Sequence, residues 1–274
     1  MNKKIEVTII GLGQIGASLG LALKKRAAKR YNVTGVARRK EVLKTALKIG
    51  AVDIASLSFD IAKTADIIVV CTPVDTISEI YKKLLSIVKA NAIITDVGSI
   101  KTFARKEIPK SKTAAFVGGH PMAGKENNGI QSADANMFAG AKFIMTGNNA
   151  KTVENKVANM WKSAGAKIIK MDASAHDGLV ALTSHLPHVI AFSLNKVYKD
   201  VKKKNKNIDL LAAGSFKSAT RVANSSANMW APVLSANNKN VIKHLDAFIK
   251  ELNAFKKILK NKNKTKRKIL QTQK

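Results

Sequence analysis

The sequence predicts an α/β protein in which an N-terminal domain built on a parallel sheet is followed by an all-helical C-terminal domain. Short runs rich in β-branched residues alternate with helical patterns over the first 170 residues, which is typical of a parallel sheet with helical crossovers. A glycine-rich turn follows the first of these runs, and no convincing strand pattern appears after Ala175. A length of 274 residues fits one large or two modest domains.

The predicted strands are short apolar runs. Residues 65–71 (ADIIVVC) have the length and composition of a central strand that is buried on both faces. The other predicted strands cover residues 5–10, 33–36, 92–95, 114–117, 142–146 and 167–170. Helical patterns extend from the glycine-rich turn to Leu23 and cover residues 41–48, 76–88 and 153–161.

The pattern changes near residue 172. Apolar residues then recur at helical spacing over 179–197 and again over 241–255. Pro187 lies inside the first of these helices, where it removes a backbone hydrogen bond and should bend the helix. We therefore predict a first domain over residues 1–172 and an all-helical second domain over 173–255. Residues 256–274 hold nine basic residues and no acid, which predicts a flexible basic tail.

The chain is strongly basic, with 48 lysines and arginines against 18 acids and a formal charge of +30. Such an excess would ordinarily suggest nucleic acid, because neutralised phosphates dominate that binding. The lysines, however, occur in almost every segment, and aromatic residues, which form the stacking platforms of single-strand binders, make up only 5%. We therefore do not expect nucleic acid as the main partner.

Cysteine content and hydropathy predict the compartment. Cys71 is the single cysteine, which excludes an intramolecular disulfide and a four-thiolate zinc site and fits a reducing cytoplasm. No apolar run approaches the roughly 18 residues that span a bilayer. Glu6 interrupts the apolar stretch after the basic start, which argues against a signal peptide. We expect a cytoplasmic protein without a membrane association or a metal site.

A GxGxxG pattern lies at Gly11, Gly13 and Gly16, where it ends a predicted strand and opens a predicted helix. The first glycine permits the tight turn, the second lets a pyrophosphate approach the backbone, and the third allows close packing of helix on strand. The phosphates would lie at the positive N-terminus of that helix. The pattern therefore predicts a Rossmann-type dinucleotide site. The predicted cofactor-binding residues here are Gly11, Gly13, Gln14, Ile15, Gly16, Thr72 and Pro73.

The second strand bears on the choice of cofactor. In NAD-binding proteins an acid about 20 residues beyond the glycines binds the ribose 2′-hydroxyl. Here Ala37 stands in that place and is followed by Arg38 and Arg39. An arginine suits a 2′-phosphate, and a missing carboxylate removes repulsion. We predict NADP, with NAD as the alternative if the two arginines are merely further exposed cations.

Several polar segments follow predicted strands or fall within the helical domain. The carboxyl edge of a parallel sheet, where ligands bind, would receive Thr72-Pro73-Val74, residues 96–101 (DVGSIK) and residues 118–124 (GGHPMAG). The helical domain contributes residues 184–188 (SHLPH) and residues 214–221 (GSFKSATR), followed by Met229-Trp230.

With these segments in this order, the sequence resembles the prephenate/arogenate dehydrogenase family of the tyrosine pathway. The resemblance extends from the glycine loop to about residue 255, and DVGSIK, GGHPMAG and SHLPH are more specific than the glycine loop. It implies NAD(P)-dependent oxidative decarboxylation of prephenate or arogenate. A hydride leaves the ring carbon that bears the hydroxyl, and the ring carboxylate departs as carbon dioxide. It also implies a homodimer formed through the helical domain.

His120 and Ser99 are the predicted catalytic residues. Loss of hydride from a carbinol requires a base on its hydroxyl, and a neutral imidazole titrates in the right range. His120 lies on a glycine-rich turn and matches the catalytic histidine of the family. Ser99 matches the family's active-site serine, which would bind the same hydroxyl or orient the imidazole. The alternative for His120 is a residue that stabilises the turn before Pro121.

The resemblance assigns a second group of residues to the substrate. Arg221 matches the family arginine that holds a substrate carboxylate, since a guanidinium can bind both oxygens. His188 and His185 are three apart on one helix face and are predicted pocket groups, with satisfied core histidines as the alternative. Trp230 lines the pocket or is a buried core residue. Glu126 matches a family acid that pairs with the arginine and gates access.

Ser218 departs from the family, which often has an acid three residues before the arginine, so the orientation of Arg221 must come from elsewhere. Prephenate and arogenate stay open as substrates. One alternative is another oxidoreductase with a Rossmann and a helical domain, of the 3-hydroxyacid dehydrogenase or pyrroline-5-carboxylate reductase type. That class would not call for the His120 loop together with SHLPH and Arg221. A non-catalytic protein that binds nucleotide or nucleic acid is the second alternative.

Overall fold

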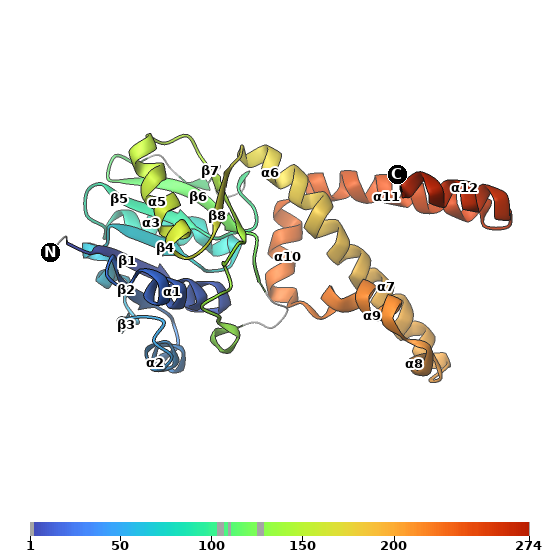
Figure 1. Cartoon of the computed structure of the whole chain (residues 1–274), viewed down its shortest axis with the longest axis horizontal. Helices are drawn as coiled ribbons and strands as arrows, with labels where there is room; N and C mark the ends of the chain where they lie inside the picture. Colours follow the sequence, from blue (N-terminus) through green and yellow to red (C-terminus); the bar gives the residue numbers. More distant parts are fainter. Residues whose placement is uncertain (1–2, 103–106, 109–110, 125–128, 274) are drawn as a thin grey trace. The chain divides into compact units, whose positions relative to one another are not determined.

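The chain forms two compact units (Figure 1). The computed structural model describes residues 3–102, 107–108, 111–124 and 129–273. The first unit comprises Met1–Asp177 and Asn224–Ala236, and the second comprises Gly178–Ala223 and Asn237–Lys274. The chain therefore crosses between the units three times, because a short segment after the second unit's first helices returns to the first unit.

An eight-stranded sheet forms the first unit, with the strand order β3-β2-β1-β4-β5-β6-β7-β8 (Figure 1). Its strands are β1 (Ile5–Ile10), β2 (Tyr31–Val36), β3 (Ile54–Ser56), β4 (Ile67–Val70), β5 (Ala92–Asp96), β6 (Ala114–Pro121), β7 (Lys142–Thr146) and β8 (Lys167–Lys170). All seven predicted strands are present, and the predicted α/β class is confirmed. The short edge strand β3 was not among the predictions, since its sequence has the length of a link.

The sequence analysis predicts a parallel sheet, but one pair of strands in the structure is antiparallel. Strands β6 and β7 pair antiparallel, with Gly119 opposite Met145, whereas every other neighbouring pair is parallel. A parallel return usually needs a crossover helix. The described part of the connection between β6 and β7 contains only the short 3-10 turn η3 (Ile130–Ser132), which does not provide one.

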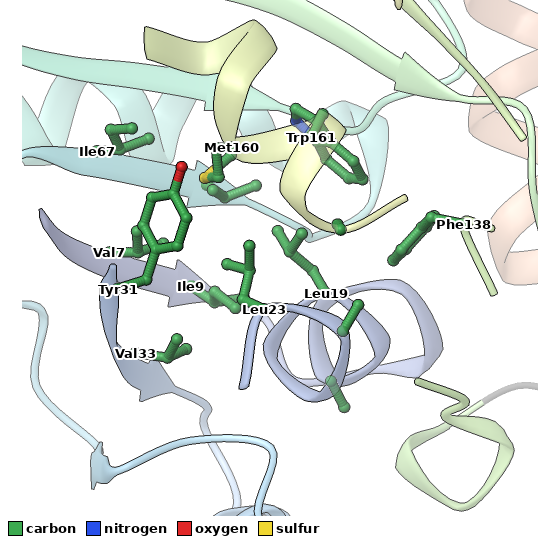
Figure 2. Packing of buried hydrophobic residues seen from close by; sticks show 14 of the residues in the cluster. Val7, Ile9, Leu19, Leu23, Tyr31, Val33, Ile67, Phe138, Met160 and Trp161 are labelled. Atoms are coloured by element: carbon green, nitrogen blue, oxygen red, sulfur yellow. The ribbon is translucent and has the colours of Figure 1, made fainter. Parts of the chain in front are cut away.

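Helices cover both faces of the sheet and bury its apolar side chains. The helices assigned wholly to the first unit are α1 (Gln14–Ala27), α2 (Lys40–Lys48), α3 (Ile77–Leu85), α5 (Lys151–Ser163) and α10 (Ala227–Ala236). Leu19 of α1 and Trp161 of α5 pack in one core with Ile9 of β1 (Figure 2). On the opposite face, Tyr81 of α3 meets Phe116 edge-on, with ring centroids 5.5 Å apart.

The strand ends define where a ligand can approach. Ile10 of β1 pairs with Val70 of β4, and Val70 pairs with Asp96 of β5. Three adjacent strands therefore end level with one another. Because parallel strands deliver their following loops to one edge, the segments after β1, β4 and β5 emerge side by side.

In its described residues the second unit contains helices and the turns that join them, and no strand. Its elements are η4 (Ala181–His185), α7 (Leu186–Lys204), α8 (Ile208–Leu211), α9 (Gly214–Thr220), α11 (Asn238–Ile258) and α12 (Lys262–Thr272), preceded by α6 (Ala173–Val180), which begins in the first unit. Helix α7 contacts α9 and α11. Pro187 lies in the first turn of α7, directly after the π-helical segment η4, within a helical run that continues over residues 173–204. The helical hydrogen-bond pattern therefore changes beside the proline, which has no N–H to donate.

The basic end of the chain is helical rather than extended. Helix α12 packs on α11, where Lys268 pairs with Glu251 at 2.6 Å and lies over the Phe255 ring. The Asn261 side chain accepts the Lys264 N–H and so caps the helix. The charge pattern that predicts a flexible tail does not reveal this helix, because the contacts of α12 depend on one acid and one aromatic ring of α11. Within the described residues, no helix has the length and apolar character needed to cross a membrane.

Candidate active site

The glycine loop between β1 and α1 has a shape that only glycine allows. Gly11 has a φ of 96°, and a Cβ there would lie 2.6 Å from the Cys71 carbonyl oxygen. A Cβ on Gly16 would lie 2.0 Å from the Gly11 oxygen. Both close approaches bring the start of α1 against the ends of β1 and β4. Thr72 lies against Gly11 on the β4 side and receives a hydrogen bond of 2.8 Å from Thr76, and Pro73 beside it is exposed.

The start of α1 can hold a dinucleotide. A Cβ on Gly13 would meet no heavy atom within 4 Å, so the backbone here is open to close approach. Gly13 offers no side chain to cap the helix, and the first turn, which includes Gln14 and Ile15, contains no acid. The N–H groups and the helix dipole therefore favour an anion. These features fit a pyrophosphate.

Arg38 and Arg39 follow β2 at the same edge. Val36, the last residue of β2, pairs with Ile10 of β1, so the two arginines leave the sheet beside the glycine loop. Both are exposed, and Arg39 is the residue before the first turn of α2. Two guanidinium groups accordingly lie beside the place where an adenosine ribose would lie in a Rossmann-type site, and Ala37 stands where an acid would bind that ribose.

A buried ion pair joins the turn after β5 to the end of β6. Asp96 and Lys101 are both buried, and the Lys101 ammonium donates to the Asp96 carboxylate. Asp96 also accepts the backbone N–H groups of Gly98 and Gly119, each at 2.9 Å. Lys101 donates to the Gly119 carbonyl oxygen at 2.5 Å. Burial, only partly offset by Asp96, lowers the pKa of Lys101.

Two imidazoles and a carboxylate form a chain of hydrogen bonds. His120 Nδ1 lies 2.9 Å from His176 Nε2, and His176 Nδ1 lies 2.7 Å from Asp177 Oδ1. His120 belongs to β6, whereas His176 and Asp177 belong to α6. The latter two are buried, and His120 is half-buried at the outer end of the chain of bonds.

Asp177 is the anchor of this chain of bonds. It accepts the backbone N–H groups of Lys101 at 2.9 Å and Thr102 at 2.8 Å, together with the Thr102 hydroxyl. Burial alone would raise the pKa of Asp177, but the hydrogen bonds from His176, Thr102 and the two backbone groups outweigh burial and lower it. Asp177 is therefore a carboxylate at neutral pH.

The predicted catalytic residues of the first unit come together, because Asp96 binds the backbone beside each of them. Ser99 follows Gly98, and His120 follows Gly119; both side chains are half-buried. Trp230 lies on α10, which contacts the turn η2 (Val74–Thr76) of the first unit, and is buried. Glu126 lies outside the described residues.

The remaining predicted residues belong to the second unit. His188 Nδ1 donates to the Ser184 carbonyl oxygen at 2.9 Å, and burial lowers the pKa of His188, so its ring is neutral at pH 7. His185 is buried, with its Nδ1 3.2 Å from the Asn237 side-chain nitrogen. Arg221 is exposed at the start of η5 (Arg221–Asn224).

Four polar residues of the site were not predicted: Asp96, Lys101, His176 and Asp177. The first two flank Ser99 within DVGSIK, and an acid and a lysine five residues apart could have suggested a pair. The adjacent His176 and Asp177 carry a weaker signal. Nothing in the sequence links them to His120, which lies 56 residues earlier than His176.

Models of known families match nearly the whole chain. The nucleotide-binding domain of prephenate dehydrogenase matches residues 19–170, and the dimerization domain of prephenate dehydrogenase matches residues 172–272.

Individual proteins resemble the chain over most of its length. Prephenate dehydrogenase of Lactococcus lactis subsp. cremoris is 33% identical over 251 residues, which cover 90% of this chain and 69% of that protein. Cyclohexadienyl dehydrogenase of Zymomonas mobilis subsp. mobilis is 34% identical over 257 residues, which cover 90% of this chain and 85% of that protein. A crystal structure of prephenate dehydrogenase from A. aeolicus with hydroxyphenyl propionate and NAD+ has a TM-score of 0.90 at 28% identity, covering 99% and 96%.

Replacing the anchor carboxylate tests the hydrogen-bond chain through stability. We expect Asp177→Asn to lower the free energy of unfolding at pH 7 by about 2 kcal/mol, because an amide places a donor against buried donors. The pKa of Asp177 is lower in the folded than in the unfolded chain, where it is about 3.9. The carboxylate's contribution is therefore present above that pH and lost as pH falls through the folded-state pKa.

Urea unfolding between pH 3 and pH 7 measures this difference. The gap between wild type and Asp177→Asn should narrow below about pH 4. Asp200→Asn, at an exposed ion pair with Lys196, is the control and should change stability far less. A gap of the same size at both ends of the pH range would contradict the assignment.

Proposed function

The chain belongs to the prephenate dehydrogenase family, and from this premise we propose that it catalyses the NAD(P)-dependent oxidative decarboxylation of prephenate or arogenate. The substrate ring loses a hydride from its hydroxyl-bearing carbon and its ring carboxylate as carbon dioxide, and becomes aromatic. The bound nicotinamide supplies the hydride acceptor. The observation that supports the proposal most strongly is the His120–His176–Asp177 chain of hydrogen bonds, which lies at the same sheet edge as the dinucleotide loop.

The hydrogen bonds assign the tautomers of both imidazoles. The Asp177 carboxylate can only accept, so His176 Nδ1 carries a proton. We assign this one proton to the His176 ring, so that its Nε2 accepts the hydrogen bond and His120 Nδ1 donates it. His120 Nε2 is consequently the unprotonated nitrogen. A neutral imidazole whose other nitrogen donates to a fixed partner is the form that a general base needs.

We assign the proton transfer to this nitrogen. His120 Nε2 takes the proton from the ring hydroxyl as the hydride leaves, which gives a ring carbonyl. When the ring carboxylate then departs as carbon dioxide, the electron pair of the broken C–C bond enters the ring, and the phenolate oxygen that results takes the proton back from His120. Asp177, acting through His176, stabilises the imidazolium that forms, as a buried carboxylate does in other hydrogen-bonded histidine systems. Ser99 binds the same hydroxyl and orients it toward His120.

The substrate carries carboxylates, and the second unit supplies the cation that we assign to one of them. The Arg221 guanidinium can bind a carboxylate through two parallel hydrogen bonds. Neutral His188 can donate or accept at Nε2, since its Nδ1 is engaged by Ser184. We place His185 and Trp230 in the wall of the substrate pocket.

Loss of the base should abolish most turnover. We expect His120→Asn to lower kcat by about 10²–10⁴-fold, which is the usual contribution of a general base. Reduced-cofactor absorbance with prephenate and arogenate, each with NAD and NADP, measures it. His244→Asn, a histidine outside the proposed site, is the control and should retain kcat. No turnover by the wild type in any of the four combinations would contradict the proposed reaction.

Arg221 should act on substrate binding. We expect Arg221→Ala to raise the KM for the substrate by about 10-fold or more, because a charged hydrogen-bonding partner of the carboxylate is lost. The KM for the cofactor should change little. Arg267→Ala, at an exposed arginine of the same unit, is the matched control. An unchanged substrate KM in Arg221→Ala would place the carboxylate elsewhere.

We propose NADP as the preferred cofactor, because Arg38 and Arg39 are exposed beside the glycine loop and no acid stands at Ala37. Arg38→Ala should raise the KM for NADP by about 10-fold, since a charge-assisted bond to the 2′-phosphate is lost, and should leave the KM for NAD within about twofold. Lys48→Ala, at the far end of α2, is the control. Equal effects on both cofactors would contradict a role in 2′-phosphate binding.

We propose that the second unit forms a homodimer. Its matched family model is described as a dimerization domain. Val197 of α7 and Leu252 of α11 are 59% and 52% exposed, and further exposed apolar residues accompany them on both helices. Covering such side chains against a second copy removes apolar surface from water. Sedimentation equilibrium of the full chain should give twice the monomer mass, and a monomer at micromolar concentration would contradict the proposal.

A further inference from the structure

The buried pair of Asp96 and Lys101 touches the backbone of both catalytic segments. We propose that this pair is a positioning device that holds Ser99 and His120 in a fixed relation to one another. The inference rests on the proposed function in assigning catalysis to these two residues. Neither Asp96 nor Lys101 needs to touch the substrate for the device to work.

The side chains of the pair replace the backbone hydrogen bonds between β5 and β6 at the point where these strands stop pairing. Strands β5 and β6 pair only as far as Thr95 and Val117, and β5 ends one residue later. Gly119 is buried beyond that point, and buried backbone groups must find partners. Its N–H donates to Asp96 and its carbonyl oxygen accepts from Lys101. Two side chains of one turn therefore fix the backbone immediately before His120.

The same carboxylate fixes the backbone beside Ser99. Asp96 accepts the Gly98 N–H at 2.9 Å through the oxygen that also binds Lys101, and binds Gly119 through its other oxygen. One rigid, planar group thus joins the two segments. The segments also pack without spare room, because a Cβ on Gly119 would lie 2.6 Å from the Asp96 backbone oxygen and 2.3 Å from the Phe143 ring.

Lys101 extends the connection to the histidine chain. Its backbone N–H donates to Asp177 Oδ1, the oxygen that also binds His176 Nδ1. A shift of residues 98–102 would therefore move Ser99 together with Lys101, which binds Gly119. It would also disturb Asp177, which binds His176. His120 is held at its backbone by the ion pair and at its ring through Asp177.

A charged pair performs this task better than a neutral one. Asp96 receives donors on both oxygens, so an amide in its place would direct its NH₂ group against at least one backbone N–H. Burying an ion pair seldom adds stability, and such pairs can instead fix a unique geometry. Among the described residues, the side-chain hydrogen bonds of the pair join Asp96 to Lys101 or end on the backbone of Gly98 and Gly119.

The first test separates positioning from folding by comparing kcat with KM. We expect Asp96→Asn to lower kcat by about tenfold or more while the KM values for substrate and cofactor stay within about threefold, as for an effect confined to the transition state. Glu154→Gln is the matched control. Glu154 is also a buried carboxylate of the first unit, paired with Lys170 at 2.8 Å and bound to the Asn149 N–H, but it touches neither catalytic segment. It should retain kcat.

A double variant addresses the case in which Asp96→Asn fails to fold because it leaves a buried ammonium without its carboxylate. Asp96→Asn/Lys101→Met keeps similar volumes and buries no lone charge. Circular dichroism measures its folding, and amide hydrogen exchange by NMR measures Gly98 and Gly119. We expect a folded protein in which both amides exchange at least about tenfold faster and kcat is lowered as in the single variant.

The outcomes distinguish this inference from the proposed function. A folded double variant with the wild-type kcat would overturn the positioning role, and so would a loss of kcat matched by an equal loss of substrate and cofactor binding. Unchanged exchange of Gly119 would also overturn it. If the wild type turned over neither substrate, the proposed reaction would be wrong. Faster exchange at Gly98 and Gly119 in the double variant would still show that Asp96 and Lys101 hold these two backbone segments.

Discussion

The site depends on one constraint, which is that three neighbouring parallel strands end at the same level. Ile10, Val70 and Asp96 are paired across β1, β4 and β5, so the glycine loop, the Thr72 turn and the Ser99 turn leave the sheet together. The register is fixed by packing, since a slip of one residue would turn each buried side chain to the opposite face of the sheet, where other helices cover it. The segments to which we assign catalysis take their places from this packing.

The same edge creates a problem of buried polar groups, and its solution forms the site. Beyond the last β5–β6 pair, the backbone of β6 stays buried and pairs with β7 on one side, but it has no strand partner on its β5 side. Asp96 and Lys101 satisfy it, and Asp177 satisfies the backbone of the next turn. Because these hydrogen bonds are directional, they restrict the backbone conformation of the segments that carry Ser99 and His120. The residues that satisfy the buried backbone groups are therefore also the ones that hold Ser99 and His120 in the places that we propose for catalysis.

Unlike these buried groups, most of the residues that give the chain its large positive charge lie at the surface. Most lysines are exposed, and the acids available to them form ion pairs of small value. Arg38, Arg39 and Arg221 are the cations to which we assign ligands, and Lys101 is the buried cation in this site. A broad positive field can still concentrate an anionic substrate and cofactor near the protein.

The sequence by itself determined the α/β class, the strand positions, the glycine loop and the family. Each of these depends on local patterns, such as continuous apolar runs, glycine spacing and short motifs. Ser99, His120 and Arg221 could be proposed as site residues from the sequence because each lies within a motif. Other features did not follow from local patterns: α12 is a helix that packs on α11, and β7 runs antiparallel to β6, with no crossover helix in the described part of their connection.

Tertiary structure alone decided how these residues are connected. His176 and Asp177 lie far from His120 in the chain, and only folding places one imidazole 2.9 Å from the other. The role of Asp96 likewise depends on where β5 stops relative to β6, which no local pattern specifies. Hydrogen bonds between distant segments are set by sheet register and packing, and both are properties of the whole fold. The sequence determined which chemical groups are present, and the fold determined which of them act together.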